Sequence, residues 1–127
     1  MEKDVSDKDY RIEKDSMGEL KVPSASHWGP QTQRAVENFQ ISQIKMPSGF
    51  IRSLALLKWA ISSANAELDL ISQEKAKVIG DVALKIADGQ YSDEFPVDVF
   101  QTGSGTSTNM NMNEVIANLS STDELKI

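Results

Sequence analysis

The stretch whose residue types could do chemistry runs from Gln101 to Glu114 and reads QTGSGTSTNMNMNE. Gly103 and Gly105 flank Ser104, and residues without a Cβ let the backbone turn sharply and approach a ligand closely. If a helix begins near Thr106, its unpaired N–H groups and the positive end of its dipole face this turn. The sequence therefore predicts a neutral, donor-rich cradle for an anion, either a small carboxylate or a phosphate.

The same turn also has an ordinary structural interpretation. A Gly-Ser-Gly turn before a segment rich in Ser and Thr is a common way to begin a helix. Short glycine motifs have many false positives, so the residues alone leave both interpretations open. A P-loop is excluded, because no lysine follows the second glycine at the required place.

Asparagines recur at positions 109, 111 and 113, inside the predicted helix, although Asn is a mediocre helix former. Asn109 and Asn113 are four residues apart and share one face. Buried amides need hydrogen-bond partners, so this polar row suggests a network that orients the hydroxyls of the turn. A polar seam between helices explains it equally well. From chemistry and position, we expect Thr102, Asn109 and Asn113 to support the turn.

The remaining candidates for chemistry are few. His27 is the only histidine and lies in a Ser-His-Trp loop, where we expect a loop or packing residue despite the aptitude of imidazole for acid–base work. Asp93 and Glu94 form a carboxylate pair with no histidine companion in sequence, so we expect no metal site there. The absence of cysteine excludes disulfides, thiolate metal sites and a cysteine nucleophile.

The composition narrows the class of protein. The 127 residues are enough for one domain. The net charge is −6 with no basic cluster, which argues against nucleic acid or an anionic membrane surface as a partner. The longest apolar run, Leu54–Leu57, is far below the roughly 18 residues needed to cross a bilayer. The charged start MEKDVSDKDY shows no signal peptide, so we expect a soluble cytoplasmic protein.

The first third of the chain is predicted to hold a tail, a small extended element and a helix. Residues 1–9 are charged and poor in apolar side chains, which is typical of a mobile tail. Residues 10–22 predict a pair of short strands or an extended arm. Pro30 suits the first turn of a helix, whose apolar positions continue almost to Ile44 before Pro47 stops the segment.

The strongest helix signal follows, with Ser48 as its predicted N-cap. Apolar residues recur at steps of four and three, which is a helical stripe that should pack on another helix. Its members are Phe50, Leu54, Leu57, Ile61, Ala64, Leu68 and Ile71.

A further helix is predicted to begin after Ser72, as N-cap, with Glu74 in its first turn. Gly89 fits the residue just beyond its end. Its thinner apolar stripe consists of Ala76, Ile79, Ala83 and Ile86. The predicted architecture is therefore mainly α-helical, with a short extended or β element near the N-terminus.

Three separated blocks carry a family resemblance: RIEKDSMGELKVP, WGPQTQRAVENFQIS and EFPVDVFQTGSGTSTNMNMNEVIAN. Their order and spacing over residues 11 to about 119 resemble class II fumarate hydratases, members of the fumarase/aspartase superfamily. EKDSMG, WGPQTQR and QTGSGT are closer to fumarases than to aspartases, which more typically show EEDLLG, a YYG-type block and QGGAGT. Met112 in NMNMN favours fumarases too.

The resemblance implies reversible addition of water to fumarate, giving (S)-malate, without a metal or organic cofactor. It implies that Ser104, Gly105 and Thr106 hold a carboxylate of the dicarboxylate substrate. Residues 10–127 then correspond to the N-terminal domain of the superfamily fold. The family forms homotetramers around a central helical domain, and each active site combines three subunits.

The resemblance also implies that the catalytic acid and base lie outside these residues. In the family, a paired-serine block, a His-Thr block and a mobile serine loop follow downstream, and nothing here matches them. We therefore expect a fragment that is inactive alone. Two alternatives remain: a helical module for assembly or regulation, or part of another superfamily lyase such as aspartase.

Overall fold

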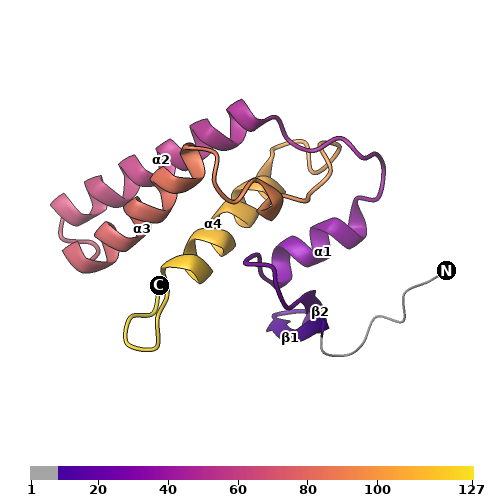
Figure 1. Ribbon diagram of the computed structural model, residues 1–127, viewed down its shortest axis with the longest axis horizontal. Helices are drawn as coiled ribbons and strands as arrows, with labels where there is room; N and C mark the ends of the chain where they lie inside the picture. The colour runs from indigo at the N-terminus through magenta and orange to yellow at the C-terminus, as the bar shows by residue number, and fades with distance from the viewer. Residues whose placement is uncertain (1–8) are drawn as a thin grey trace.

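The computed structural model describes residues 9–127 and is mainly helical, as predicted (Figure 1). The prediction of a mobile tail over residues 1–9 lies, apart from Asp9, outside the described residues. The elements follow in the order β1 (Tyr10–Asp15), β2 (Gly18–Pro23), α1 (Pro30–Asn38), α2 (Ser48–Glu67), α3 (Gln73–Ala87), the short 3-10 helix η2 (Ser92–Glu94) and α4 (Thr106–Ser120).

The predicted extended element is a two-stranded antiparallel hairpin. Tyr10 pairs with Pro23 at its open end, and Asp15 pairs with Gly18 at its turn. Gly18 has φ +116°, a conformation that favours glycine, and the Asp15 carboxylate accepts a hydrogen bond from the N–H of Met17 at 2.9 Å. The hairpin therefore ends in a tight turn beside α1.

Helix α1 begins at Pro30 as predicted but ends at Asn38, so the prediction of helix almost to Ile44 was wrong. Backbone groups beyond Asn38 pair with a distant segment instead. The Asp98 carboxylate accepts from the N–H of Ser42, and the N–H of Val99 donates to the carbonyl of Ile44 at 2.9 Å. These long-range bonds replace the helical ones, which is why the helix stops.

Helix α2 also differs from the prediction at both ends. Its N-cap is Pro47, whose carbonyl accepts from the N–H of Phe50, while Ser48 is the first helical residue and makes no capping bond. The helix ends at Glu67, before the left-handed residue Asp69 with φ +57°. Ser48 could not act as the cap because the helical conformation already includes it.

Helices α2 and α3 lie side by side as a hairpin (Figure 1). The buried residues of α2 are Ile51, Ala55, Ser62 and Ala66. On α3, Gly80 lies against Trp59, where an added Cβ would come within 3.1 Å of the indole. Small residues thus let the two helices approach closely. The predicted α2 stripe is a different face, and most of it stays exposed.

Helix α3 follows its prediction closely. The Ser72 hydroxyl accepts from the N–H of Lys75 at 3.2 Å, which confirms the predicted N-cap. The helix ends at Ala87, and Gly89 follows with φ +96°. Within the predicted stripe, Ala83 and Ile86 are buried in the core.

Helix α4 runs between the α2–α3 pair and α1 (Figure 1). Met112, Val115 and Ile116 are buried and belong to the same apolar cluster as Ile51 and Phe95. Because α4 is anchored on both sides, the turn at its start has a fixed position. Among the described residues, no helix is long and apolar enough to span a membrane.

Candidate functional site

The Gly-Ser-Gly-Thr turn has the geometry of a helix start, as the sequence predicted. Helix α4 begins at Thr106, and its N-cap is Gly105 with φ +73°. The N–H of Gly105 donates to the carbonyl of Thr102 at 2.9 Å and closes the turn. A left-handed φ favours glycine at this position because a Cβ would add strain.

The start of α4 carries hydrogen-bond donors that the described part of the chain does not use. The Gln101 side chain accepts from both the N–H and the hydroxyl of Thr108, at 2.8 and 2.9 Å. The N–H groups of Thr106 and Ser107 have no acceptor within the described part of the chain. Ser104 and Thr106 are exposed, so two hydroxyls accompany these backbone donors. Such a set suits an anion.

Sequence reasoning missed the capping role of Gln101. The usual cap lies two or three residues before the amide it satisfies, whereas Gln101 acts across seven residues. The backbone reverses direction between Gln101 and Thr106, and this reversal brings the Gln101 side chain over the start of α4. The signal was present as a glutamine directly before the glycine-rich turn, but no local rule identifies it.

The three residues expected to support the turn have different surroundings. The Thr102 hydroxyl lies 3.2 Å from that of Ser107 and so braces the turn. Asn109 is half-buried, whereas Asn113 is exposed and borders a groove that Lys58 also lines. The fully buried amide is Asn111, which donates to the carbonyl of Glu94 at 2.8 Å. Asn111 shares the core face of Val115, four residues later.

A cavity of about 350 Å³ lies directly beside the turn. One wall is the hairpin turn with Met17, another is α1 with Arg34 and Asn38, and the third is the start of α4 with Thr106 and Ser107. The three sequence blocks that carry the family resemblance therefore meet around one cavity. This juxtaposition is the main geometric reason to treat the turn as a site.

The one cation at this cavity among its described lining residues is already paired. Arg34 donates from Nε and Nη2 to the two oxygens of Asp15, at 2.7 and 2.8 Å, and to the carbonyl of Gly18 at 3.1 Å. These side-chain hydrogen bonds from Arg34 hold the pKa of Asp15 below its usual value. The ion pair thus fixes the hairpin on α1 and shapes the cavity wall.

Replacing Asp15 with Asn should flatten the acid side of the stability profile. Because the pKa of Asp15 is lowered in the folded state, its stabilisation is fully present above the unfolded value of about 4. It is lost as the pH falls through the lower folded value. We expect Asp15→Asn to be less stable than wild type at pH 7 and to converge with it in acid.

Urea unfolding at a series of pH values measures this effect. Asp98→Asn is the matched comparison. Burial opposes ionisation of Asp98, but hydrogen bonds from Phe100 and Ser42 outweigh it and leave its pKa lowered too. Each variant should therefore remove only part of the acid dependence. Parallel profiles for Asp15→Asn and wild type would contradict the assignment.

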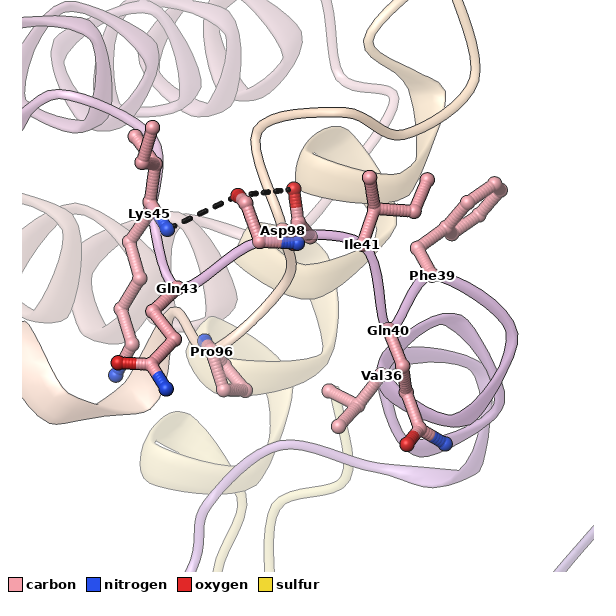
Figure 2. Close-up of a pocket in the computed structure, with 10 residues that line it drawn as sticks. Val36, Phe39, Gln40, Ile41, Gln43, Lys45, Pro96 and Asp98 are labelled. Atoms are coloured by element: carbon pink, nitrogen blue, oxygen red, sulfur yellow. Dashed lines mark hydrogen bonds between the residues drawn. The ribbon is translucent and has the colours of Figure 1, made fainter.

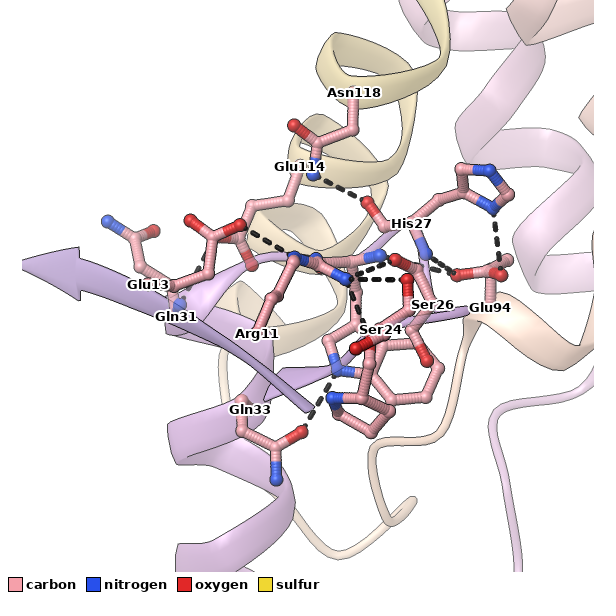
Figure 3. Close-up of polar contacts among 12 residues, drawn as sticks. Arg11, Glu13, Ser24, Ser26, His27, Gln31, Gln33, Glu94, Glu114 and Asn118 are labelled. Atoms are coloured by element: carbon pink, nitrogen blue, oxygen red, sulfur yellow. Dashed lines mark hydrogen bonds and ion pairs between the residues drawn. The ribbon is translucent and has the colours of Figure 1, made fainter. Parts of the chain in front are cut away.

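A network of polar contacts holds the loop before α1 (Figure 3). Arg11 donates to the carbonyls of Pro23, Ser26 and Trp28 at 2.7, 2.7 and 2.5 Å. Asn118 on α4 donates to the carbonyl of His27 at 2.7 Å. The β1–β2 hairpin and α4 thus both form hydrogen bonds to the loop before α1, from two sides.

Glu114 on α4 caps the start of α1 from outside that helix (Figure 3). Its carboxylate accepts from the N–H and hydroxyl of Thr32 at 2.7 and 2.6 Å, and from the N–H of Gln31 at 3.1 Å. The N-cap of α1, Gly29, has no side chain to do this. A carboxylate at a helix N-terminus is also favoured by the helix dipole. Glu114 therefore fixes α4 relative to α1.

The expectation that Glu94 has no histidine companion was wrong. His27 Nδ1 lies 3.1 Å from one Glu94 oxygen, and the N–H groups of His27 and Trp28 donate to the other. The imidazole also packs edge-on against Tyr91, with ring centroids 6.0 Å apart. His27 is thus a packing residue, as predicted. The described residues contain no group of three His, Asp or Glu that could hold a metal.

A second, wider pocket of about 670 Å³ lies between residues 39–45 and the Pro96–Asp98 segment (Figure 2). Asp98 sits in its wall, and its carboxylate holds the N–H and hydroxyl of Ser42 and the N–H of Phe100. No residue of the β1–β2 hairpin lines this pocket, so only two of the three family-like sequence blocks reach it. The smaller cavity beside Thr106 is therefore the better candidate site.

Comparison with known proteins identifies relatives of this chain. A family described as Lyase matches residues 18–126. A class II fumarate hydratase of Xylella fastidiosa is 58% identical over 120 residues, which are 94% of this chain and 25% of that protein. The class II fumarate hydratase of Mycobacterium tuberculosis is 55% identical over 116 residues, 91% of this chain and 24% of that protein.

The fold has counterparts among solved structures. The crystal structure of the class II fumarase from Schistosoma mansoni superposes with a TM-score of 0.86 at 37% identity, covering 88% of this chain and 24% of that one. The chain thus spans about a quarter of the length of the relatives it matches. A family match over most of the residues, together with a shared helical fold, shows that this chain belongs to the lyase family that includes the class II fumarate hydratases.

Proposed function

We propose that these residues are the N-terminal part of a fumarate hydratase and supply one substrate-binding segment to its active site. The enzyme reversibly adds water across the double bond of fumarate and gives (S)-malate. The observation that carries the proposal is the meeting of three family-like blocks around the cavity beside Thr106. Identities above 50% to class II fumarate hydratases support it.

In this proposal the turn binds a carboxylate of the dicarboxylate. Ser104 and Thr106 donate from their hydroxyls, and Thr106 adds its backbone N–H. Gly105, whose own N–H stays bonded to Thr102, lets the backbone approach the carboxylate closely. In the dehydration of malate to fumarate, a base from another part of the full-length protein takes a proton from the carbon next to this carboxylate, and the electron pair moves onto the carboxylate. The hydroxyl then leaves the other carbon as water, protonated by an acid from another part of the protein, and the electron pair returns from the carboxylate to form the double bond. Donors placed where charge develops lower that barrier.

The supporting residues follow from the same arrangement. Thr102 braces the turn through Ser107, and we assign Asn109 and Asn113 to the polar side of α4 behind it. The acid and base that move protons come from other parts of the full-length protein. The proposed reaction uses no metal or organic cofactor.

The proposal extends to domain organisation and assembly. Residues 10–127 form the N-terminal domain, and a central helical domain follows in the full-length enzyme. That enzyme is a cytoplasmic homotetramer in which each active site combines several subunits. Neither nucleic acid nor a membrane takes part.

Activity measurements on two proteins test the proposal. The 127-residue chain alone should not hydrate fumarate, because it lacks the acid and base. A chimera should: this chain replaces the matching quarter of the Mycobacterium tuberculosis enzyme, to which it is 55% identical. Hydration by the isolated chain would refute the division of roles. Ammonia release from aspartate by the chimera, without malate formation, would favour an aspartase.

A further inference from the structure

Helix α2 is apolar on two faces. One face carries Ile51, Ala55 and Ala66 and is buried within the domain. The other face, which we call the α2 seam, has residues at steps of four, three, four, three and four. The α2 seam consists of Phe50, Leu54, Leu57, Ile61, Ala64 and Leu68.

The α2 seam is largely uncovered. Leu54 is half-buried at the edge of the core. The other large members are exposed, with relative exposures of 45% for Phe50, 52% for Leu57, 43% for Ile61 and 68% for Leu68. A continuous apolar surface of this kind marks an interaction site more often than chance exposure does.

The spacing of residues in the α2 seam indicates that its binding partner is a second helix. Alternating steps of three and four average 3.5 residues, which is the period of a coiled-coil seam. Along such a seam, side chains insert between those of a second helix that runs nearly parallel or antiparallel. A flat surface or a small ligand would not require this strict repeat.

We propose that the α2 seam is a contact between two copies of this chain, packed antiparallel about a two-fold axis near residue 59. A two-fold contact uses the same surface on both copies, and the seam is self-complementary in this register. Phe50 meets Leu68 of the partner subunit. Leu54 meets Ala64 of the partner subunit, which pairs a large side chain with a small one. Leu57 meets Ile61 of the partner subunit, next to the axis.

The available area agrees with a second copy. A fully exposed large apolar side chain presents about 200 Å², so the exposed seam offers roughly 400 Å² per copy and roughly 800 Å² per pair. Ala60 and the stem of Lys58 flank the seam and add to this area, which stays within the range of weak, transient interfaces below or near ~1,000 Å². The contact is thus large enough for a dimer of modest affinity.

The charges beside the α2 seam fit the antiparallel register. No member of the seam is charged, and Glu67 lies opposite Ser53 of the partner subunit. The two Lys58 side chains lie near the axis, where their flexible stems let the ammonium groups diverge into water. Their repulsion weakens with salt, so dimerisation should strengthen as ionic strength rises.

The contact does not depend on the proposed function and is separate from a tetramer built on a central domain.

Sedimentation equilibrium on the 127-residue chain tests the proposal. The contact area lies near the lower size limit of specific interfaces, so the dimer should be weak. Wild type should therefore form dimers at high chain concentrations, on the order of 200 µM. Leu57→Ser combined with Ile61→Ser should raise the dissociation constant at least tenfold without unfolding the domain. Leu84→Ser is the matched control, because Leu84 is 41% exposed on α3 and lies off the seam. A monomeric wild type, or equal weakening by the control, would overturn the proposal.

Cross-linking tests the orientation, and the chain has no native cysteine to interfere. In the antiparallel register, the two copies of residue 60 are about 3 Å apart along the direction of the helix axes, and the two copies of residue 53 are about 18 Å apart. A short bis-maleimide should therefore join Ala60→Cys chains into dimers but leave Ser53→Cys chains single. Cross-linking of both variants would show a parallel pair, and cross-linking of neither would show a different surface. Either result would overturn the proposal.

Discussion

In the chimeric hydratase, Thr106→Val should lower kcat/KM by about 100-fold to 1,000-fold, the effect typical of losing one donor to a developing negative charge. Valine keeps the branched shape of threonine and removes only the hydroxyl. Thr106 is exposed at the first position of α4, so the fold does not depend on that hydroxyl. The loss should fall mainly on kcat, because the carboxylate gains charge only as the reaction proceeds.

Steady-state kinetics of fumarate hydration measure this effect. Thr122→Val is the control, because it removes a hydroxyl of the same kind just beyond the other end of α4. Ser104→Ala should resemble Thr106→Val, whereas the control should stay near wild type. An unchanged kcat/KM for Thr106→Val would remove this turn from the active site while leaving the family assignment intact.

The second large effect concerns Glu114, the carboxylate that joins α4 to α1. Glu114→Ala should reduce the free energy of unfolding by about 2–3 kcal/mol, because hydrogen bonds to a charged group are among the stronger ones and their loss strands helix donors. The stranded donors are the N–H groups of Gln31 and Thr32 and the Thr32 hydroxyl. Urea unfolding should show a lower midpoint at an unchanged slope. Glu124→Ala, at an exposed position, is the matched control.

Gly29 offers an independent check of the same contact. A Cβ at Gly29 would overlap the Glu114 carboxylate, although the backbone there, with φ −112°, suits any residue. Gly29→Ala should therefore destabilise wild type but cost much less in the Glu114→Ala background. A double-mutant cycle measures this coupling. Additive effects would show that the two residues do not meet.

Local rules explain which parts of the fold the sequence predicted. Ser72 and Gly89 bound α3 as expected, and Pro30 starts α1. Each of these signals acts within one helical turn, so neighbouring residues suffice to determine it. The errors came from long-range contacts. Asp98 takes the backbone groups that would have continued α1 towards Ile44.

Helix α2 likewise has features that local sequence predicts and features that only long-range contacts determine. Its seven-residue stripe correctly indicated a helix, because periodicity is a property of the chain alone. The choice of the face that packs inside the domain depended on α3, whose Gly80 accepts the Trp59 side of α2. The tertiary structure buried the small residues of α2 and left the more apolar face exposed.

The turn at Gly105 combines both sources of information. The sequence by itself determined the glycine-rich turn, the helix that begins at Thr106 and the family resemblance, because these depend on residue types and on short spacings. Only the tertiary structure brought Met17, Arg34 and Thr106 around one cavity and placed the Gln101 side chain over the start of α4. Contacts between residues far apart in the chain depend on how all the helices pack together, and no single stretch of sequence contains that information.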